Sequence, residues 1–183
     1  MKYLSVDLET TGLDHTKHSV IEFAAILADT NNGGEIKGAF RGHIFPENMV
    51  WDSYCLRLHR EWLDWILNIP QAKWAENLIY SDMVQLMGAF AAWRETYGLE
   101  KSVSVAGKNF GTFDSRFLMG NYCDRWYKRR IIDVGTMYRE KGDDVLPDLE
   151  TCKRRSGLFE SNRVAHDALS DAMDVVKLVN HKW

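Results

Sequence analysis

The chain has 183 residues, of which 45% are hydrophobic and 27% are charged, and its formal net charge is −3. This composition is that of an ordinary globular protein and excludes a disordered, collagen-like or low-complexity chain. The small negative charge excludes a uniformly basic nucleic-acid coat, but it suits a site in which carboxylates hold cations. The length predicts a single domain over residues 1–183.

Targeting and cysteine signals indicate where the protein functions. Asp7 comes before any apolar signal core can form, and the longest apolar run, Phe23 to Ala28, is far too short to span a membrane. The three cysteines lie far apart and include no C-x-x-C pair, so they predict neither a disulfide framework nor a zinc site. We therefore expect a cytoplasmic protein with no membrane partner.

The first part of the chain predicts three strands. Apolar and polar residues alternate over residues 3–9, and branched and small apolar residues fill residues 19–28. A turn of asparagine and glycine at residues 31–34 precedes a third strand over residues 39–45. Connections this short predict an antiparallel meander.

The rest of the chain alternates between helical and strand patterns. We expect helices over residues 58–69, 83–97, 113–123, 147–157 and 167–179, and strands over residues 102–107 and 131–137. This order predicts an α/β fold with a mixed five-stranded sheet flanked by helices. Residues 46–101 are too few to bury a large core alone, so they are interpreted as a helical elaboration of the single domain.

Two carboxylates occur on the first predicted strand. Asp7 and Glu9 are two residues apart, so both side chains project from the same face of the strand. Two carboxylates held in this way can bracket a divalent cation, which prefers oxygen ligands. The solvated face of an alternating strand also carries acids without a metal, and the pair alone does not separate these interpretations.

Three further residues with suitable chemistry lie near predicted helix starts. Asp114 follows the strand at residues 102–107, and Asp171 lies early in the last predicted helix, where an acid is also favoured by the helix dipole. His166 is five residues before Asp171, and in a continuous helix the two side chains would diverge by roughly 140°. Both can serve one site only if His166 lies in the entry loop or the first irregular turn.

Together these residues suggest one chemistry. Four converging acids would repel one another and be partly protonated unless cations neutralised them. Such a cluster is typical of two metal ions about 3.5–4 Å apart that hold the attacking and leaving oxygens of a phosphodiester. A histidine beside them can accept a proton, an effect worth about 10²- to 10⁴-fold in rate.

Three motifs of the chain resemble those of the DEDDh (DnaQ-like) 3′–5′ exonucleases. The motifs are residues 6–13 (VDLETTGL), residues 109–114 (NFGTFD) and residues 166–171 (HDALSD), in the order found in that family. The similarity covers residues 1–45 and 103–181, and details of the sequence resemble bacterial and phage-encoded oligoribonuclease-like members. Residues 46–101 match no subfamily.

The resemblance implies a ribonuclease H-like fold and hydrolysis of single-stranded RNA, DNA or short oligonucleotides from the 3′ end to 5′-mononucleotides. It implies that the protein binds two Mg²⁺ or Mn²⁺ ions and functions in the cytoplasm of a bacterial or phage-infected cell. A homodimer is one possible assembly. The implied metal ligands are Asp7, Glu9, Asp114 and Asp171, the implied general base is His166, and the implied substrate contacts are Leu8, Thr10, Thr11, Leu13, Asn109 and Phe113. Leu13 would wedge against the terminal base, although a core position after the turn is equally compatible with the sequence.

Other residues are candidates for contact with the nucleic acid. Two basic clusters, at residues 125–130 and 153–155, could neutralise phosphates while Trp126 and Tyr127 stack on bases, or could simply be solvated surface. Basic residues of the inserted segment are further candidates for phosphate contact: Arg57, His59, Arg60 and Lys73. Two alternatives stay open, namely a phosphodiesterase of the same fold that acts on dinucleotides or cyclic nucleotides, and a nucleic-acid-binding module without catalysis.

Overall fold

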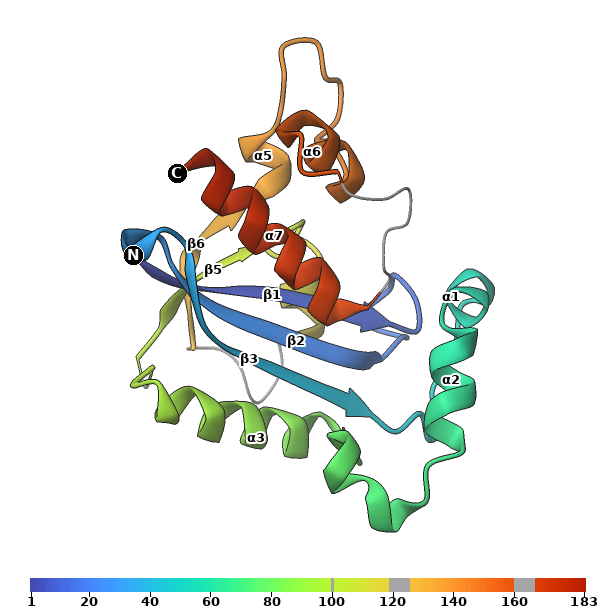
Figure 1. Ribbon diagram of the computed structural model, residues 1–183. Coiled ribbons are helices and arrows are strands. Elements are labelled where there is room, and N and C mark those ends of the chain that lie inside the picture. Colours follow the sequence, from blue (N-terminus) through green and yellow to red (C-terminus); the bar gives the residue numbers. More distant parts are fainter. Residues whose placement is uncertain (100, 119–125, 160–166) are drawn as a thin grey trace.

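The computed structural model describes residues 1–99, 101–118, 126–159 and 167–183 (Figure 1). Its centre is a mixed six-stranded sheet with the order β4-β3-β2-β1-β5-β6. The first three strands form the predicted antiparallel meander, whereas β4, β5 and β6 each run parallel to the neighbour they join. The strands are β1 (Lys2–Thr10), β2 (Val20–Asp29), β3 (Glu35–Ile44), β4 (Ile79–Tyr80), β5 (Val103–Gly107) and β6 (Tyr127–Asp133).

Helices cover both faces of this sheet (Figure 1). The helix α7 crosses one face, α3 lies along the other, and α1 and α2 stand beyond the end of the sheet to which β1 and β3 point. The α-helices are α1 (Ser53–Leu58), α2 (Arg60–Leu67), α3 (Met83–Thr96), α4 (Asp114–Leu118), α5 (Val134–Met137), α6 (Leu149–Ser156) and α7 (Ala168–Lys182). Short 3₁₀ turns are η1 (Thr30–Asn32), η2 (Gln71–Lys73) and η3 (Ala75–Asn77). None of the helices in the described ranges combines the length and the apolar character needed to cross a bilayer.

The observed elements correct the predicted ones in two places. The sheet has six strands rather than five, because β4 lies within the segment interpreted as helical. A strand of two residues is too short to show any periodicity, so the sequence gives no signal for it. The strand predicted over residues 131–137 ends at Asp133, whose side chain accepts a hydrogen bond from the Thr136 main-chain N–H and starts α5.

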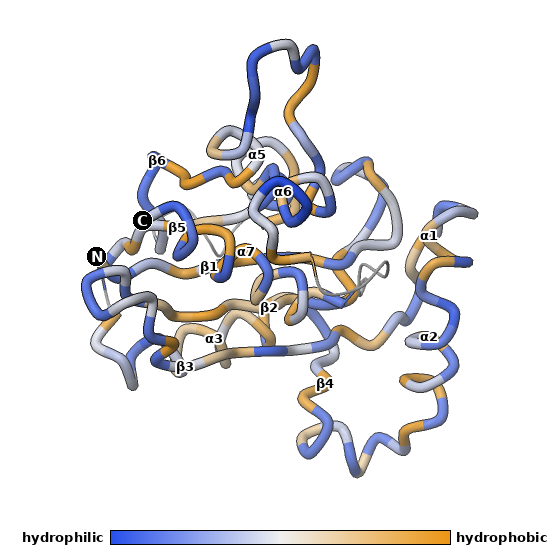
Figure 2. The backbone as a smooth tube through the Cα atoms, turned by 45° about the horizontal axis from the view of Figure 1, so that its top comes forward, coloured by the Kyte–Doolittle hydropathy of each residue, from blue (hydrophilic) through white to orange (hydrophobic). Residues whose placement is uncertain are grey.

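The alternation of β1 divides the protein into two cores. Its apolar residues Leu4, Val6 and Leu8 pack toward α3, together with alternate residues of β2 and β3. The opposite face carries Tyr3 and packs against α7, most of whose apolar side chains are buried there. The most hydrophobic stretches of the chain run along the central strands (Figure 2). Burial on both faces holds β1 rigidly, and β1 carries the first motif.

Aspartate caps fix where five of the helices begin. In each case the side chain of the residue before the helix accepts a hydrogen bond from a main-chain N–H of the first turn, an interaction worth about 1 kcal/mol. The cap of α7 sets the position of Asp171, which lies in its first turn. The capping residues are Asp52 for α1, Asp82 for α3, Asp133 for α5, Asp148 for α6 and Asp167 for α7.

Candidate metal centre and substrate pocket

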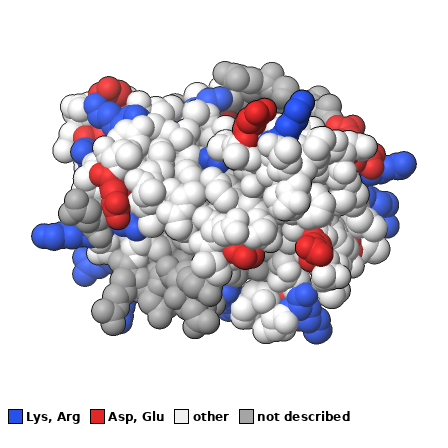
Figure 3. All heavy atoms as spheres, turned by 90° about the horizontal axis from the view of Figure 1, so that it is seen from below, with Lys and Arg blue, Asp and Glu red and all other residues white. Residues whose placement is uncertain are grey.

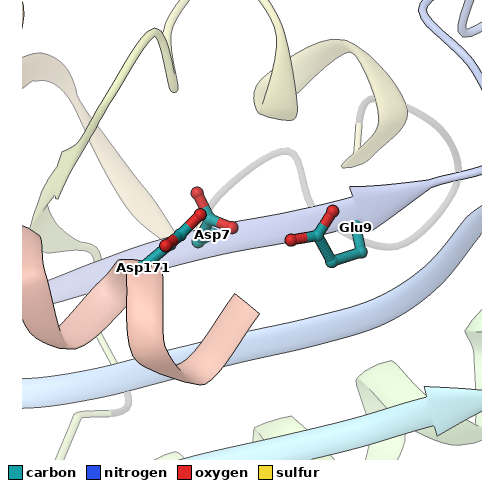
Figure 4. A group of neighbouring side chains, drawn as sticks. All are labelled: Asp7, Glu9 and Asp171. Carbon is teal, nitrogen blue, oxygen red and sulfur yellow. The ribbon is translucent and has the colours of Figure 1, made fainter. Parts of the chain in front are cut away.

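Three of the predicted carboxylates converge at the face of the sheet that α7 covers (Figure 4). Asp7 and Glu9 project from β1, and Asp171 reaches them from the first turn of α7. One ligand oxygen of each of these residues lies within 4.8 Å of the others. The residues come from opposite ends of the sequence, so the fold itself assembles this group.

Asp114, at the start of α4, is the fourth predicted acid, and its side chain is buried beside the same strand. It accepts a hydrogen bond from the main-chain N–H of Leu8, between Asp7 and Glu9, and it interacts electrostatically with both of these acids. β5 pairs with β1 only as far as Ser5, so the Leu8 N–H has no partner strand on that side. Asp114 therefore belongs to the same cluster.

The electrostatics of the cluster are those of acids forced together. Burial and then the neighbouring carboxylates raise the pKa of Asp7 well above its usual range. Burial raises the pKa of Glu9 to about 9 and the pKa values of Asp114 and Asp171 to about 7. Each group would be ionised at neutral pH in water, so the folded protein favours their protonation unless a cation replaces the protons.

The position of Asp171 fits a cation ligand. The buried Ser5 hydroxyl on β1 donates to the main-chain oxygen of Ala172 at 2.7 Å, which fixes the turn of α7 that carries Asp171. The Oδ1 atom of Asp171 is buried and has no hydrogen-bond partner among the described residues. A buried carboxylate oxygen without a donor is unfavourable unless something else binds it. An oxygen-rich group of this kind suits a hard divalent cation.

Two histidines bear on this site. His166, the predicted general base, lies outside the described residues, and α7 begins two residues after it. His59, at the junction of α1 and α2, is buried, and its Nε2 atom is 3.4 Å from the Oε2 atom of Glu9. The sequence suggested that His59 contacts phosphate, whereas the structure places it against a predicted metal ligand.

A pocket with a volume of about 490 Å³ opens next to the carboxylates. One wall comes from the end of β1 and the turn after it, and the other comes from α1, which lies in the inserted segment. The lining includes Glu9, so the pocket reaches the metal centre directly. Its residues are Leu8, Glu9, Thr10, Leu13, Asp14, His18, Asp52, Tyr54, Cys55, Leu58, His59 and Phe113.

The turn after β1 is built to present this wall. The Thr10 hydroxyl donates to the main-chain oxygen of Gly12, and the Asp14 N–H donates to Nδ1 of His18. A Cβ atom at Gly12 would lie 2.6 Å from the His18 ring, so any other residue there would displace that ring. The Asp52 N–H donates to the Thr11 carbonyl at 2.8 Å, which attaches the start of α1 to the first motif.

The predicted substrate contacts divide into two groups. Leu8, Thr10, Leu13 and Phe113 line the pocket. Leu13 is 79% exposed, so the alternative that it is a core residue is wrong. The other two do not line the pocket: Thr11 is buried and accepts a hydrogen bond from the Ser19 N–H, and Asn109 is exposed at the end of β5 in a left-handed conformation. Their predicted contacts with substrate stay predictions.

The first basic cluster does not have the predicted form. Trp126 is 6% exposed and packs in the core, so it cannot stack on a base, and Tyr127 packs against Phe110. Lys128, Arg129 and Arg130 are exposed on the edge strand β6, and Arg125 lies outside the described residues.

The second basic cluster is engaged with acids. Lys153 pairs with Asp174, Arg154 with Glu150, and Arg155 with Asp143. These pairs leave little positive charge for phosphates. On the side of α3, basic and acidic side chains of the described residues are interspersed toward the rim (Figure 3), so that face offers no continuous basic track.

Sequence reasoning missed several residues of the site. Tyr54 and His18 line the pocket, but nothing in their spacing distinguishes them from ordinary surface residues. Glu22 on β2 is buried and electrostatically coupled to Asp7, Glu9 and Asp171. A glutamate within an otherwise apolar strand is a signal that could have identified it, because buried glutamate is rare unless it is paired.

The fold agrees with comparisons to known proteins. Residues 4–78 match the family model RNase_T, which describes exonucleases. The nuclease domain of 3′hExo, a DEDDh family member bound to rAMP, superposes with a TM-score of 0.70 at 18% identity, covering 98% of this chain and 90% of that one. Cell-death related nuclease 4 has a TM-score of 0.67 at 18% identity, covering 98% of this chain and 62% of that one. Exonuclease I of E. coli with a dA16 oligonucleotide has a TM-score of 0.61 at 18% identity, covering 98% of this chain and 40% of that one.

No curated protein sequence matches the chain. The chain spans less than two thirds of cell-death related nuclease 4 and of exonuclease I. The family match includes the first of the three motifs, and the shared fold agrees with the fold that the resemblance predicts. Residues 4–78 therefore resemble an exonuclease domain, and the whole chain has the fold of the nuclease domain of 3′hExo, a mixed sheet flanked by helices.

Proposed function

We propose that this protein is a divalent-metal-dependent 3′–5′ exonuclease that removes 5′-mononucleotides from single-stranded RNA, DNA or short oligonucleotides. The observation that carries the proposal is the convergence of Asp7, Glu9 and Asp171 within 4.8 Å, with Asp114 buried beside them. Acids held this close without a cation are costly, and the same arrangement becomes favourable when metal is bound.

Two Mg²⁺ or Mn²⁺ ions, when bound, would supply Lewis-acid activation of water and neutralise charge at the phosphorus. The protein would contribute Asp7, Glu9, Asp114 and Asp171 to hold them. β1 is buried on both faces and α7 is fixed by the contact between Ser5 and Ala172, so the carboxylates are oriented before substrate arrives.

The pocket suits the last nucleotide of a strand. It opens directly on Glu9, its rim carries the exposed apolar side chain of Leu13, and Tyr54 on α1 lies among the residues opposite. An apolar side chain and an aromatic ring can contact the face of any base, which fits a sequence-independent enzyme. The turn after β1 and the helix α1 form opposite walls of the pocket. We therefore expect the pocket to accept the end of a nucleic-acid strand rather than a nucleotide within the strand.

His166 is proposed as the general base. It precedes the first turn of α7, the turn that carries Asp171. Its role would be to accept the proton of the attacking water, while the carboxylates stay ionised as metal ligands.

Labelled substrates test the proposal. Single-stranded RNA, single-stranded DNA and dinucleotides labelled at the 5′ end are incubated with the protein in Mg²⁺, Mn²⁺ or EDTA. A ladder that shortens from the 3′ end, is abolished by EDTA and is absent for Asp171→Asn supports the proposal. Asp64→Asn, an exposed acid on α2, is the matched control and should leave the ladder unchanged.

The same experiment decides between the alternatives. Cleavage of dinucleotides alone would favour the phosphodiesterase that acts on short substrates. Binding of the oligonucleotides without cleavage, in any metal, would favour a binding module and contradict the exonuclease.

A further inference from the structure

An ion pair lies beside the carboxylate cluster and includes none of the predicted metal ligands. Glu22 on β2 is 2% exposed, and its Oε1 atom accepts a hydrogen bond from Arg41 Nε on β3 at 2.6 Å. The second guanidinium nitrogen of Arg41, Nη2, is 3.7 Å from Oδ1 of Asp167. Arg41 therefore bridges an acid of the sheet and the capping acid of α7.

Both acids engage the start of α7. The Glu22 carboxylate accepts a hydrogen bond from the main-chain N–H of Ala168, the first residue of the helix. Asp167 Oδ1 accepts one from the Ser170 N–H at 3.1 Å. Negative groups at a helix N-terminus are favourable because the first N–H groups have no partner within the helix. Asp171 lies in the same turn.

We infer that the Glu22–Arg41–Asp167 bridge is a positioning device that holds the first turn of α7 on the sheet, so that Asp171 meets Asp7 and Glu9 before metal binds. Arg41 is the central residue of this bridge. It touches Glu22 and Asp167, and neither of these acids is among the predicted metal ligands. This inference rests on the proposed function only in taking the carboxylate cluster as a metal site.

A purely electrostatic role and a positioning role of Arg41 predict opposite effects of its removal on cation binding. If Arg41 acted only through its charge, Arg41→Gln would make the site more negative and tighten the binding of a cation. If Arg41 positions α7, the same substitution weakens cation binding, because Asp171 is no longer held at the site. Outer partners of metal ligands are typically worth about 10–100-fold in affinity, so we expect about a tenfold loss.

Titration of the protein with Mn²⁺ alone measures this effect without any substrate. Arg41→Gln and Glu22→Gln should each bind Mn²⁺ about tenfold more weakly than the wild type, and Arg41→Lys should lie between. Lys37→Gln is the matched control, because Lys37 is on the same strand and pairs with the exposed Glu35 away from the site. Equal or tighter Mn²⁺ binding by Arg41→Gln would overturn the inference.

Two further measurements separate positioning from simple loss of fold. Amide hydrogen exchange over residues 168–171 of the metal-free protein should accelerate in Arg41→Gln and Glu22→Gln but not in Lys37→Gln. High Mn²⁺ should restore most of the exonuclease rate of Arg41→Gln, since the bound ion can itself attract Asp171. Unchanged exchange in a folded Arg41→Gln or Arg41→Lys variant would contradict the inference.

Failure of the inference and failure of the proposed function give different results. A wild type that binds Mn²⁺ but cleaves no oligonucleotide contradicts the proposed exonuclease, and the inference is then decided by the Mn²⁺ titration and the exchange data. A wild type that cleaves, with an Arg41→Gln variant that binds Mn²⁺ normally, contradicts only the inference. A wild type that binds no Mn²⁺ overturns both.

Discussion

Glu9 on β1 and Glu22 on β2 lie directly opposite each other in the antiparallel ladder, and both side chains point to the face that α7 covers. Their environments differ. Glu22 forms an ion pair with Arg41, whereas Glu9 lies beside Asp7 and Asp171 and also contacts His59. One glutamate is neutralised by the protein, and the other is arranged to be neutralised by a cation.

Asp7→Asn should abolish activity without unfolding the protein. Burial and four neighbouring acids raise the pKa of Asp7, so an amide of the same shape relieves repulsion in the metal-free state. We expect the melting temperature in EDTA to be equal to or above that of the wild type. Loss of a ligand should reduce kcat/KM by more than about 10²-fold, because even outer partners of metal ligands are worth about 10–100-fold.

Melting curves and single-stranded oligonucleotide assays of Asp7→Asn and the control Asp64→Asn check this prediction. Normal activity in Asp7→Asn would show that this residue is not a ligand. If Asp7→Asn melts below the wild type in EDTA, repulsion between the buried acids does not destabilise the metal-free protein.

Divalent metal should stabilise the folded protein. A ligand that binds only the folded state adds RT ln(1 + [L]/Kd), which is about 2.7 kcal/mol at a hundredfold excess over Kd. For a chain of this size that corresponds to a rise in melting temperature of about 5–10 °C. Differential scanning fluorimetry with Mn²⁺ from micromolar to millimolar concentration should show the rise, and Asp171→Asn should reduce it. A wild type without any shift at millimolar Mn²⁺ has no preformed site.

Without metal, stability should fall as pH rises. The folded-state pKa values of Asp114 and Asp171 are about 7 and that of Glu9 is about 9, all above the values of the unfolded chain near 4. Between these limits the folded state binds more protons than the unfolded state, so the free energy of unfolding decreases with increasing pH. The contribution is complete below about pH 4 and is lost as pH passes through about 7 and then about 9.

Thermal melts in EDTA from pH 5 to pH 9 measure this dependence. Glu9→Gln should flatten the curve between pH 7 and pH 9, since Glu9 then no longer titrates there, and saturating Mg²⁺ should flatten it in the wild type. An increase of the melting temperature with pH in EDTA would mean that these carboxylates are ionised in the folded state.

The sequence was sufficient to predict which elements carry the carboxylates and most of the fold. Asp7 and Glu9 were placed by the two-residue period of a strand, and the antiparallel meander followed from short turns between apolar runs. The place of Asp171 at the start of α7 followed from the apolar stripe of that helix. These features depend on local periodicity, which a sequence displays directly.

The remaining parts of the site depend on long-range packing. Tyr54 and His59 reach the site because Asp52 attaches α1 to the Thr11 carbonyl, and no local pattern encodes that contact. Trp126 appeared suited to stacking on a base because basic residues surround it in the sequence, but the core of the sheet covers its side chain. Exposure is set by the whole fold, so sequence reasoning fails first for substrate contacts.

Side chains of the pocket should affect substrate binding more than catalysis. Leu13 is 79% exposed and Tyr54 is 61% exposed, so neither supports the fold. Contact between a side chain and a base is worth about 1–3 kcal/mol, and Leu13→Ala or Tyr54→Ala should raise KM for an oligonucleotide at least about fivefold. Val145→Ala is the matched control, because Val145 is 77% exposed in the loop between α5 and α6.

Steady-state kinetics with single-stranded RNA and DNA test the two pocket variants. Tyr54→Phe should retain the wild-type KM, because the ring remains. A fall of kcat with unchanged KM in Leu13→Ala would indicate that the side chain acts in the chemical step rather than in holding the base.

The two histidines should differ in what they control. His166→Ala should lower kcat by about 10²- to 10⁴-fold while Mn²⁺ affinity stays within about threefold of the wild type, because a general base acts on the water and not on the metals. His59 contacts Glu9 at 3.4 Å, so His59→Gln should weaken Mn²⁺ binding and lower kcat/KM in proportion. Mn²⁺ titration and single-turnover cleavage of both variants measure these effects. If His166→Ala loses metal affinity and rate together, His166 is a ligand; if His59→Gln loses rate alone, His59 is the better candidate for the base.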